Sequence, residues 1–367
     1  MKKPTIYSIC LGMAAILLLA VLGMILTHNI ENAGLLIMAF FVFLAVGFSG
    51  YKALNSYVFT ASIFAGVALA LYYPQYFLQI GNFKLTALII PLIQLIMFGM
   101  GTSMSIGDFA EVVKSPKGVM VGVSAQLCIM PLMGFVLAKF SNFPPEIAAG
   151  IVLIGCSPSG VASNVMAYLA KANLALSITI TSISTLLAPF VTPLLMKFLA
   201  GEFIEIDVLD MMWSIIKMII LPLGAGILLN RLRGDKAKWM DKALPVISML
   251  GIGLIIVVIT AAGRDSLLDI GGVLMLLVLI HNLFGYTLGY WYARLLRLNE
   301  QDSRSIALEV GMQNGGLASG IANSLGKIAT MGLAPAVFGP LMNITGSILA
   351  SYWHKRPPKT AMNTDQK

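Results

Sequence analysis

Long apolar segments recur along the whole chain, and short polar segments separate them. About twelve of these segments are long enough to cross the hydrocarbon core of a bilayer as helices. They cover residues 6–27, 33–50, 56–73, 85–103, 117–139, 145–170, 173–199, 210–230, 243–263, 271–293, 302–325 and 329–352. The pattern predicts an all-α polytopic membrane protein.

The composition agrees with this prediction. Hydrophobic residues make up 58% of the 367 residues and charged residues 11%, whereas a soluble domain carries roughly 25% charged residues. The predicted helices and their connections use almost the whole chain, which leaves no room for a large soluble domain. Residues 354–367 are polar and are expected to form a tail.

Basic residues are concentrated in alternate connections, such as 231–242 and 294–304, and at both termini. The positive-inside rule therefore predicts that this side, with both termini, is cytoplasmic, and that the acidic connection 202–210 is external. We expect a multi-pass protein of the cell's plasma (inner) membrane. The formal net charge of +8 is spread over these connections, so no nucleic-acid partner is expected.

The first segment follows Met1, Lys2 and Lys3 as the core of a signal peptide would. Its apolar stretch is longer than such a core, and no small-x-small cleavage site follows it. We therefore expect a retained helix. Residues 1–55 would then form an additional transmembrane hairpin in front of ten further spans in residues 56–353.

Glu309 is the only carboxylate deep inside a predicted span, and residues rich in Gly and amide side chains follow it up to Gly316. A charge inside the membrane is costly and usually marks an ion site, a proton relay or a counter-ion. Glycine-rich interruptions favour a broken helix, and secondary transporters hold small cations beside such breaks. The alternative is that Glu309 is protonated and has only a structural role.

A second segment with a similar sequence lies earlier in the chain. Residues 155–163 align with residues 311–319, with Gly, Gly, Ala and Ser at matching positions. The two runs lie five spans apart, so they enter the membrane from opposite sides. Two broken helices of opposite topology predict an inverted-repeat transporter.

Residues near the two breaks offer the hard oxygen ligands that sodium prefers. Ser177 and Thr181 share one face of a helix because they are one turn apart. The other candidates are the side chains of Gln126, Ser163, Asn164, Glu309, Gln313 and Asn314 and the carbonyls of Val310 and Met312. Each hydroxyl has an alternative role in bonding its own backbone, and each amide in joining helices.

At this point the chain resembles the bile acid:sodium symporter family, especially its bacterial members related to the apical sodium-dependent bile acid transporter, over about residues 56–353. The resemblance rests on Phe98-Gly99-Met100-Gly101-Thr102, Gly155-Cys156-Ser157-Pro158-Ser159-Gly160, Ala162-Ser163-Asn164-Val165-Met166, His281-Asn282 and Glu309-Val310-Gly311-Met312-Gln313-Asn314. It implies a ten-helix inverted-repeat unit with a panel domain and a core domain, the latter carrying two crossing broken helices.

The resemblance also implies two sodium sites. The first would use Ser163, Asn164, Ser177, Thr181 and Glu309, and the second Gln126, Glu309, Val310, Met312 and Gln313. The implied substrate is an organic anion, either a bile acid or a small carboxylate such as pantoate. It would face Asn314, Asn343 and the helix N-terminus at Gly160 and Val161. Val161 and Met342 replace the Thr and His of some relatives, and each change removes a polar contact.

These observations favour sodium-coupled symport of an organic anion by alternating access. The alternative is a proton-coupled or facilitative carrier on the same fold, with Glu309 carrying the proton. An intramembrane enzyme is disfavoured because a Ser and a His without an orienting group do not make a catalytic triad. A sensor or scaffold would not need hard ligands at paired helix breaks. No obligate protein partner is expected.

Overall fold

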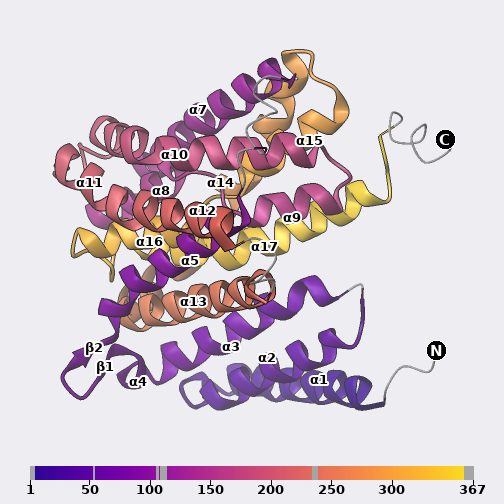
Figure 1. Ribbon diagram of the computed structural model, residues 1–367. Helices are drawn as coiled ribbons and strands as arrows, with labels where there is room; N and C mark the ends of the chain where they lie inside the picture. Colours follow the sequence, from indigo (N-terminus) through magenta and orange to yellow (C-terminus); the bar gives the residue numbers. More distant parts are fainter. Residues whose placement is uncertain (1–4, 53, 105–106, 108–113, 234–238, 359–367) are drawn as a thin grey trace.

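The computed structural model describes the chain apart from residues 1–4, 53, 105–106, 108–113, 234–238 and 359–367. It is a bundle of long helices that run in roughly the same direction across Figure 1. The helices are α1 (Thr5–Leu26), α2 (Gly34–Ser49), α3 (Val58–Tyr72), α4 (Gln75–Leu78), α5 (Ile89–Ser103), α7 (Pro116–Phe140), α8 (Pro145–Cys156), α9 (Ala162–Leu169), α10 (Leu174–Leu199), α11 (Val208–Ile215), α12 (Leu221–Arg233), α13 (Met240–Ala262), α14 (Arg264–Leu295), α15 (Glu300–Gly311), α16 (Gly315–Ser324) and α17 (Leu333–His354).

The prediction of an all-α polytopic membrane protein is confirmed. In the described part of the chain, nine helices are long and apolar enough to cross a membrane. The three remaining predicted segments are α2, which is shorter, and the two segments that were expected to be broken, which form α8–α9 and α15–α16. The strands β1 (Gln79–Ile80) and β2 (Phe83–Lys84) form one small antiparallel hairpin.

The helices form two groups. In one, the hairpin α1–α2 packs on α3, α3 packs on α13, and α13 packs on α5, which also contacts α12. In the other, α7, α8, α9, α10, α14, α15, α16 and α17 surround the two breaks. The first group occupies much of the lower half of Figure 1. The predicted boundary at residue 55 and the division into panel and core remain predictions.

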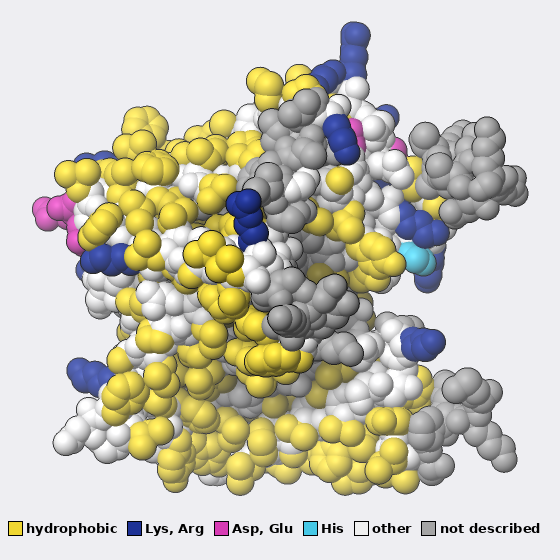
Figure 2. Space-filling view, viewed as in Figure 1, with side chains coloured by type: hydrophobic (Ala, Val, Ile, Leu, Met, Phe, Trp, Pro, Cys, Tyr) yellow, Lys and Arg dark blue, Asp and Glu magenta, His cyan; other side chains and the backbone are white. Residues whose placement is uncertain are grey.

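Large apolar side chains cover the outside of the bundle. Among them, Leu26 is 82% exposed, Phe198 85% and Leu295 80%. Figure 2 shows hydrophobic side chains across most of the visible face, with acidic side chains gathered at the left edge beside α11. Such an apolar surface is favourable in contact with lipid hydrocarbon and unfavourable in contact with water.

Candidate functional site

The two helix breaks lie against each other inside the second group. α8 ends at Cys156 and α9 begins at Ala162, while α15 ends at Gly311 and α16 begins at Gly315. The amide N–H of Gly160 donates to the carbonyl of Met312, and that of Asn314 donates to the carbonyl of Pro158, both at 2.8 Å. The breaks therefore satisfy part of each other's freed backbone groups, which the membrane interior requires.

The close approach of the breaks depends on Gly160. A Cβ atom at this position would lie 2.8 Å from the carbonyl oxygen of Gln313, a distance at which the backbone would have to move. Next to it, Ser159 donates from its hydroxyl to the carbonyl of Glu309 at 2.7 Å. This contact between the two breaks was not predicted from the sequence.

The carboxylate of Glu309, near the end of α15, is fully buried and is surrounded by hydroxyl groups. Its Oε1 accepts hydrogen bonds from Ser163 of α9 and Ser177 of α10, each at 2.5 Å. Its Oε2 accepts a hydrogen bond from Thr181 of α10 at 2.7 Å. Two consecutive helices, α9 and α10, thus supply hydroxyls to a carboxylate of the distant helix α15.

The amide oxygen of Asn164 joins this cluster. Its Oδ1 lies 2.9 Å from the hydroxyl of Ser177 and 3.4 Å from that of Thr181. Each hydroxyl has one proton, so it donates to Glu309 or to Asn164 at any one time. The structure therefore brings together all five side chains that were predicted for the first ion site. The cluster holds one carboxylate, one amide and three hydroxyls, so its formal charge is a single negative charge when the carboxylate is ionised.

The same hydroxyls serve two purposes. Ser163 also lies 2.8 Å from the carbonyl of Gly160, and Thr181 lies 3.2 Å from that of Ser177. A hydroxyl has one proton and two acceptor lone pairs. It can therefore turn its proton to a backbone carbonyl and offer its oxygen to a cation. A hydrogen bond from the hydroxyl to the backbone is therefore compatible with coordination of a cation by its oxygen.

A pair of amide side chains lies beside the cluster. Nε2 of Gln126, on α7, donates to Oε1 of Gln313 at 2.8 Å and to the carbonyl of Ser157 at 3.0 Å. Nε2 of Gln313 donates to the carbonyl of Val310 at 2.6 Å. Both side chains are buried. The structure thus places Gln126 and Gln313 side by side, next to the carbonyls of Ser157 and Val310. Their role in a second ion site stays a prediction.

The residues predicted to face a substrate differ in exposure and in the hydrogen bonds they form. Asn314 accepts a hydrogen bond from the amide of Leu317 at 3.0 Å and so caps α16. Val161, at the start of α9, is 44% exposed, whereas the amide of Gly160 is already bonded to Met312. Asn343 is half-buried on α17.

His281 and Asn282, on α14, belong to a buried polar network next to the breaks. Asn282, on α14, donates to the carbonyl of Gly311 at 2.8 Å and accepts a hydrogen bond from Thr345 of α17 at 2.6 Å. His281 lies 2.9 Å from the carbonyl of Met130 through its Nε2. These contacts hold α14 against the end of α15, against α17 and against α7. Their signal in the sequence is the pair of polar residues inside an apolar span.

The chain is similar in sequence to proteins named as sodium-dependent transporters and cotransporters. Residues 88–270 match the model described as the Sodium Bile acid symporter family. A Bacillus subtilis protein named uncharacterized sodium-dependent transporter YocS is 41% identical over 266 residues, which are 72% of this chain and 82% of that protein. The probable sodium/metabolite cotransporter BASS1 of Arabidopsis thaliana is 33% identical over 263 residues, 72% of this chain and 66% of that protein. The probable cotransporter BASS6 of the same plant is 32% identical over 308 residues, 81% and 74% of the two chains.

Proposed function

The chain belongs to the sodium bile acid symporter family, and from this premise we propose that it couples the entry of two sodium ions to the uptake of an organic anion. Membership makes it a sodium-dependent transporter, and the relatives are named as transporters and not as enzymes.

The observation that carries the proposal is the convergence of Ser163, Ser177 and Thr181 on the buried carboxylate of Glu309. One negative charge among neutral oxygen donors suits a monovalent cation with a preference for hard ligands. A bound sodium ion would compensate the buried charge, whose desolvation is otherwise costly.

The second sodium ion would bind at the neighbouring amide pair. Gln126 and Gln313 supply amide oxygens, and Glu309, Val310 and Met312 supply oxygens from the second break. Because both sites draw on Glu309 and its break, occupation of one changes the field at the other. This arrangement links the two ions to one another and to the geometry of both breaks.

The substrate would lie on the outer side of the same breaks. The N-terminus of α9, at Gly160 and Val161, carries partial positive charge and attracts an anion without Arg or Lys. Asn314 and Asn343 would supply donors for a carboxylate. This chemistry fits a bile acid or a small carboxylate such as pantoate, and the plant relatives are named as sodium/metabolite cotransporters.

For the whole chain, we propose an inverted-repeat core that works by alternating access in the plasma membrane, with both termini cytoplasmic. α1 begins and α17 ends at the right-hand side of Figure 1, which supports placing the two ends of the described chain on the same side. Residues 1–55 form an additional hairpin, and residues 56–353 form the transport unit.

The test is uptake of labelled organic anions into proteoliposomes, with and without an inward sodium gradient. Wild type is expected to accumulate a substrate only with sodium outside, and Glu309→Gln to lose this uptake because the charge that attracts sodium is gone. Asp269→Asn is the matched control, since Asp269 is exposed on α14. Uptake that follows pH and ignores sodium would instead favour the proton-coupled carrier.

A further inference from the structure

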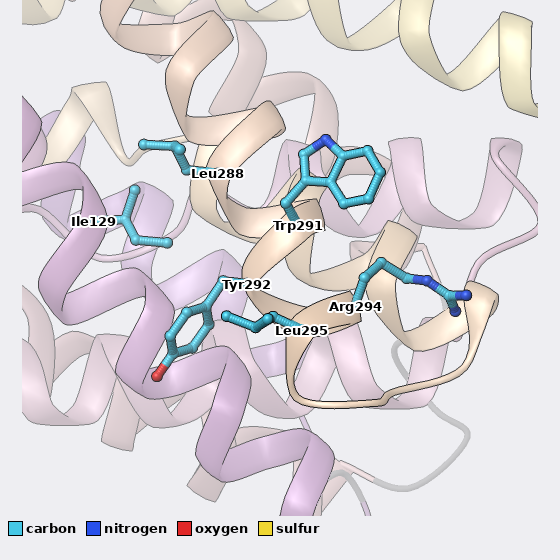
Figure 3. Close-up of a pocket in the computed structure, with 6 residues that line it drawn as sticks. All are labelled: Ile129, Leu288, Trp291, Tyr292, Arg294 and Leu295. Carbon is cyan, nitrogen blue, oxygen red and sulfur yellow. The ribbon is translucent and has the colours of Figure 1, made fainter.

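A groove on the outer face of the bundle lies between α7 and α14 (Figure 3). It has a volume of about 670 Å³, within the range of roughly 300–1,000 Å³ that is usual for small-molecule sites. Its lining residues are Ile129, Leu288, Trp291, Tyr292, Arg294 and Leu295. None of them has a part in the proposed transport sites.

The walls of the groove are apolar and open toward the lipid. Trp291 is 63% exposed and Leu295 is 80% exposed, and both α7 and α14 are apolar enough to span a membrane. In Figure 3, Ile129 on α7 faces the side chains of α14. Hydrocarbon is therefore the natural occupant of this part of the groove.

One end of the groove lies where α7 begins and α14 ends. The hydroxyls of Ser124 and Tyr292 are 3.4 Å apart, and His281 contacts the carbonyl of Met130 at 2.9 Å. Later residues of α7 thus contact earlier residues of α14, so the two helices are antiparallel. Lys117 precedes Ser124 on α7 by about 10 Å at the rise of an α-helix, and so lies toward the same end as the C-terminus of α14.

Three basic side chains are exposed on the segments that meet at this end: Lys117 near the start of α7, Arg294 at the end of α14 and Arg297 just after it. The Nη1 of Arg294 donates to the carbonyl of Leu298 at 2.8 Å. Within the described residues, none of the three forms an ion pair with a carboxylate. The carboxylate that follows in sequence, Glu300, already binds Arg304 at 2.8 Å and Tyr290 at 2.6 Å. The end of the groove therefore carries positive charge that the described protein does not neutralise.

We propose that this groove binds an anionic phospholipid, with an acyl chain along α7 and α14 and the phosphate among Lys117, Arg294 and Arg297. Basic pockets between membrane helices select anionic headgroups in this way. Trp291 fits the same arrangement, because tryptophan prefers the headgroup level of the bilayer. The site is independent of sodium coupling.

The test is a titration of the purified full-length protein in neutral detergent with phosphatidylglycerol, with phosphatidylcholine and with inorganic phosphate. Bound lipid is counted by native mass spectrometry. We expect tighter binding of phosphatidylglycerol than of phosphatidylcholine, and no competition by inorganic phosphate. Arg294→Gln and Lys117→Gln should each weaken the binding about fivefold, the value for one basic side chain at an anionic surface.

Two further variants separate the headgroup from the chain. Arg231→Gln, at an exposed Arg near the end of α12, should leave binding unchanged. Leu288→Trp fills the groove and should reduce binding while the basic side chains remain. Equal binding of both lipids, or full binding by Arg294→Gln, would overturn the proposal. The proposal would also be overturned if inorganic phosphate alone displaced the bound lipid. A lipid-free dimer that buries the groove would overturn it as well.

Discussion

At the scale of single residues, Glu309 decides the chemistry of the site, and its partners explain why it is stable there. The spacing of Ser177 and Thr181 predicted that both would share one helix face, and both contact this carboxylate. The bond from the Ser159 hydroxyl to the carbonyl of Glu309 was not predicted from the sequence. Periodicity gives the face of a helix but not the segment that packs against it.

Ser177→Ala is expected to weaken sodium binding. The serine oxygen is one of the proposed ligands and also bonds the carboxylate, and a hydrogen bond to a charged group contributes about 1.5–3 kcal/mol. The apparent sodium Kd should therefore rise roughly 10- to 100-fold, measured from the sodium dependence of thermal stability.

Ser184→Ala is the control for that experiment. Ser184 is also buried on α10, but its hydroxyl donates to the carbonyl of Thr181 in its own helix at 3.1 Å. The Ser184→Ala protein should therefore bind sodium with the affinity of the wild type. Equal sodium affinity in the Ser177 variant would show that this hydroxyl is structural.

At the scale of elements, apolar periodicity predicted where the helices lie, and Gly and amide residues predicted where two of them break. The observed breaks fall within the two predicted runs. The sequence did not predict the π-helical turn Ile216–Ile220 inside a continuous apolar segment. It also placed the start of α14 at 271 and not at Arg264, because the helix continues beyond its apolar part through polar residues.

Gly160→Ala is expected to destabilise the protein and weaken sodium binding together, because the added Cβ meets the carbonyl of Gln313 at 2.8 Å. The cost should be about 1–3 kcal/mol, as for other overpacked sites. Gly316 is the aligned glycine of the other break, and a Cβ there would lie 3.5 Å from its nearest neighbour, which is ordinary contact.

Gly316→Ala should accordingly retain stability, and thermal unfolding with and without sodium compares the two variants. If both behave alike, the tight crossing at Gly160 does not support the site.

At the scale of the whole molecule, the ion site lies on α7, α9, α10, α15 and the two breaks. The additional hairpin α1–α2 packs on α3 and supplies none of the site residues. The sequence could predict the number and type of spans because the bilayer fixes their length and polarity. It could not predict how the two groups of helices pack, because apolar surfaces look alike whether they face lipid or protein.

Transport is expected to be electrogenic. Two sodium ions that enter with one monovalent anion carry one net positive charge inward. A potential of 100 mV, negative inside, contributes about 2.3 kcal/mol per charge and should increase accumulation in proteoliposomes by roughly fiftyfold. A potassium gradient with valinomycin imposes the potential, and accumulation that does not respond to it would contradict the proposed stoichiometry.

The central claim is that Glu309 holds sodium, and a sodium titration of the thermal stability of the purified protein tests it most directly. An ion that binds only the folded state stabilises it by RT ln(1 + [L]/Kd), about 2.7 kcal/mol at 100 times Kd. Wild type should be stabilised by sodium and not by potassium or choline, and Glu309→Ala should fold without this response. A wild-type protein that is indifferent to sodium, or a variant that keeps the sodium response, would contradict the account.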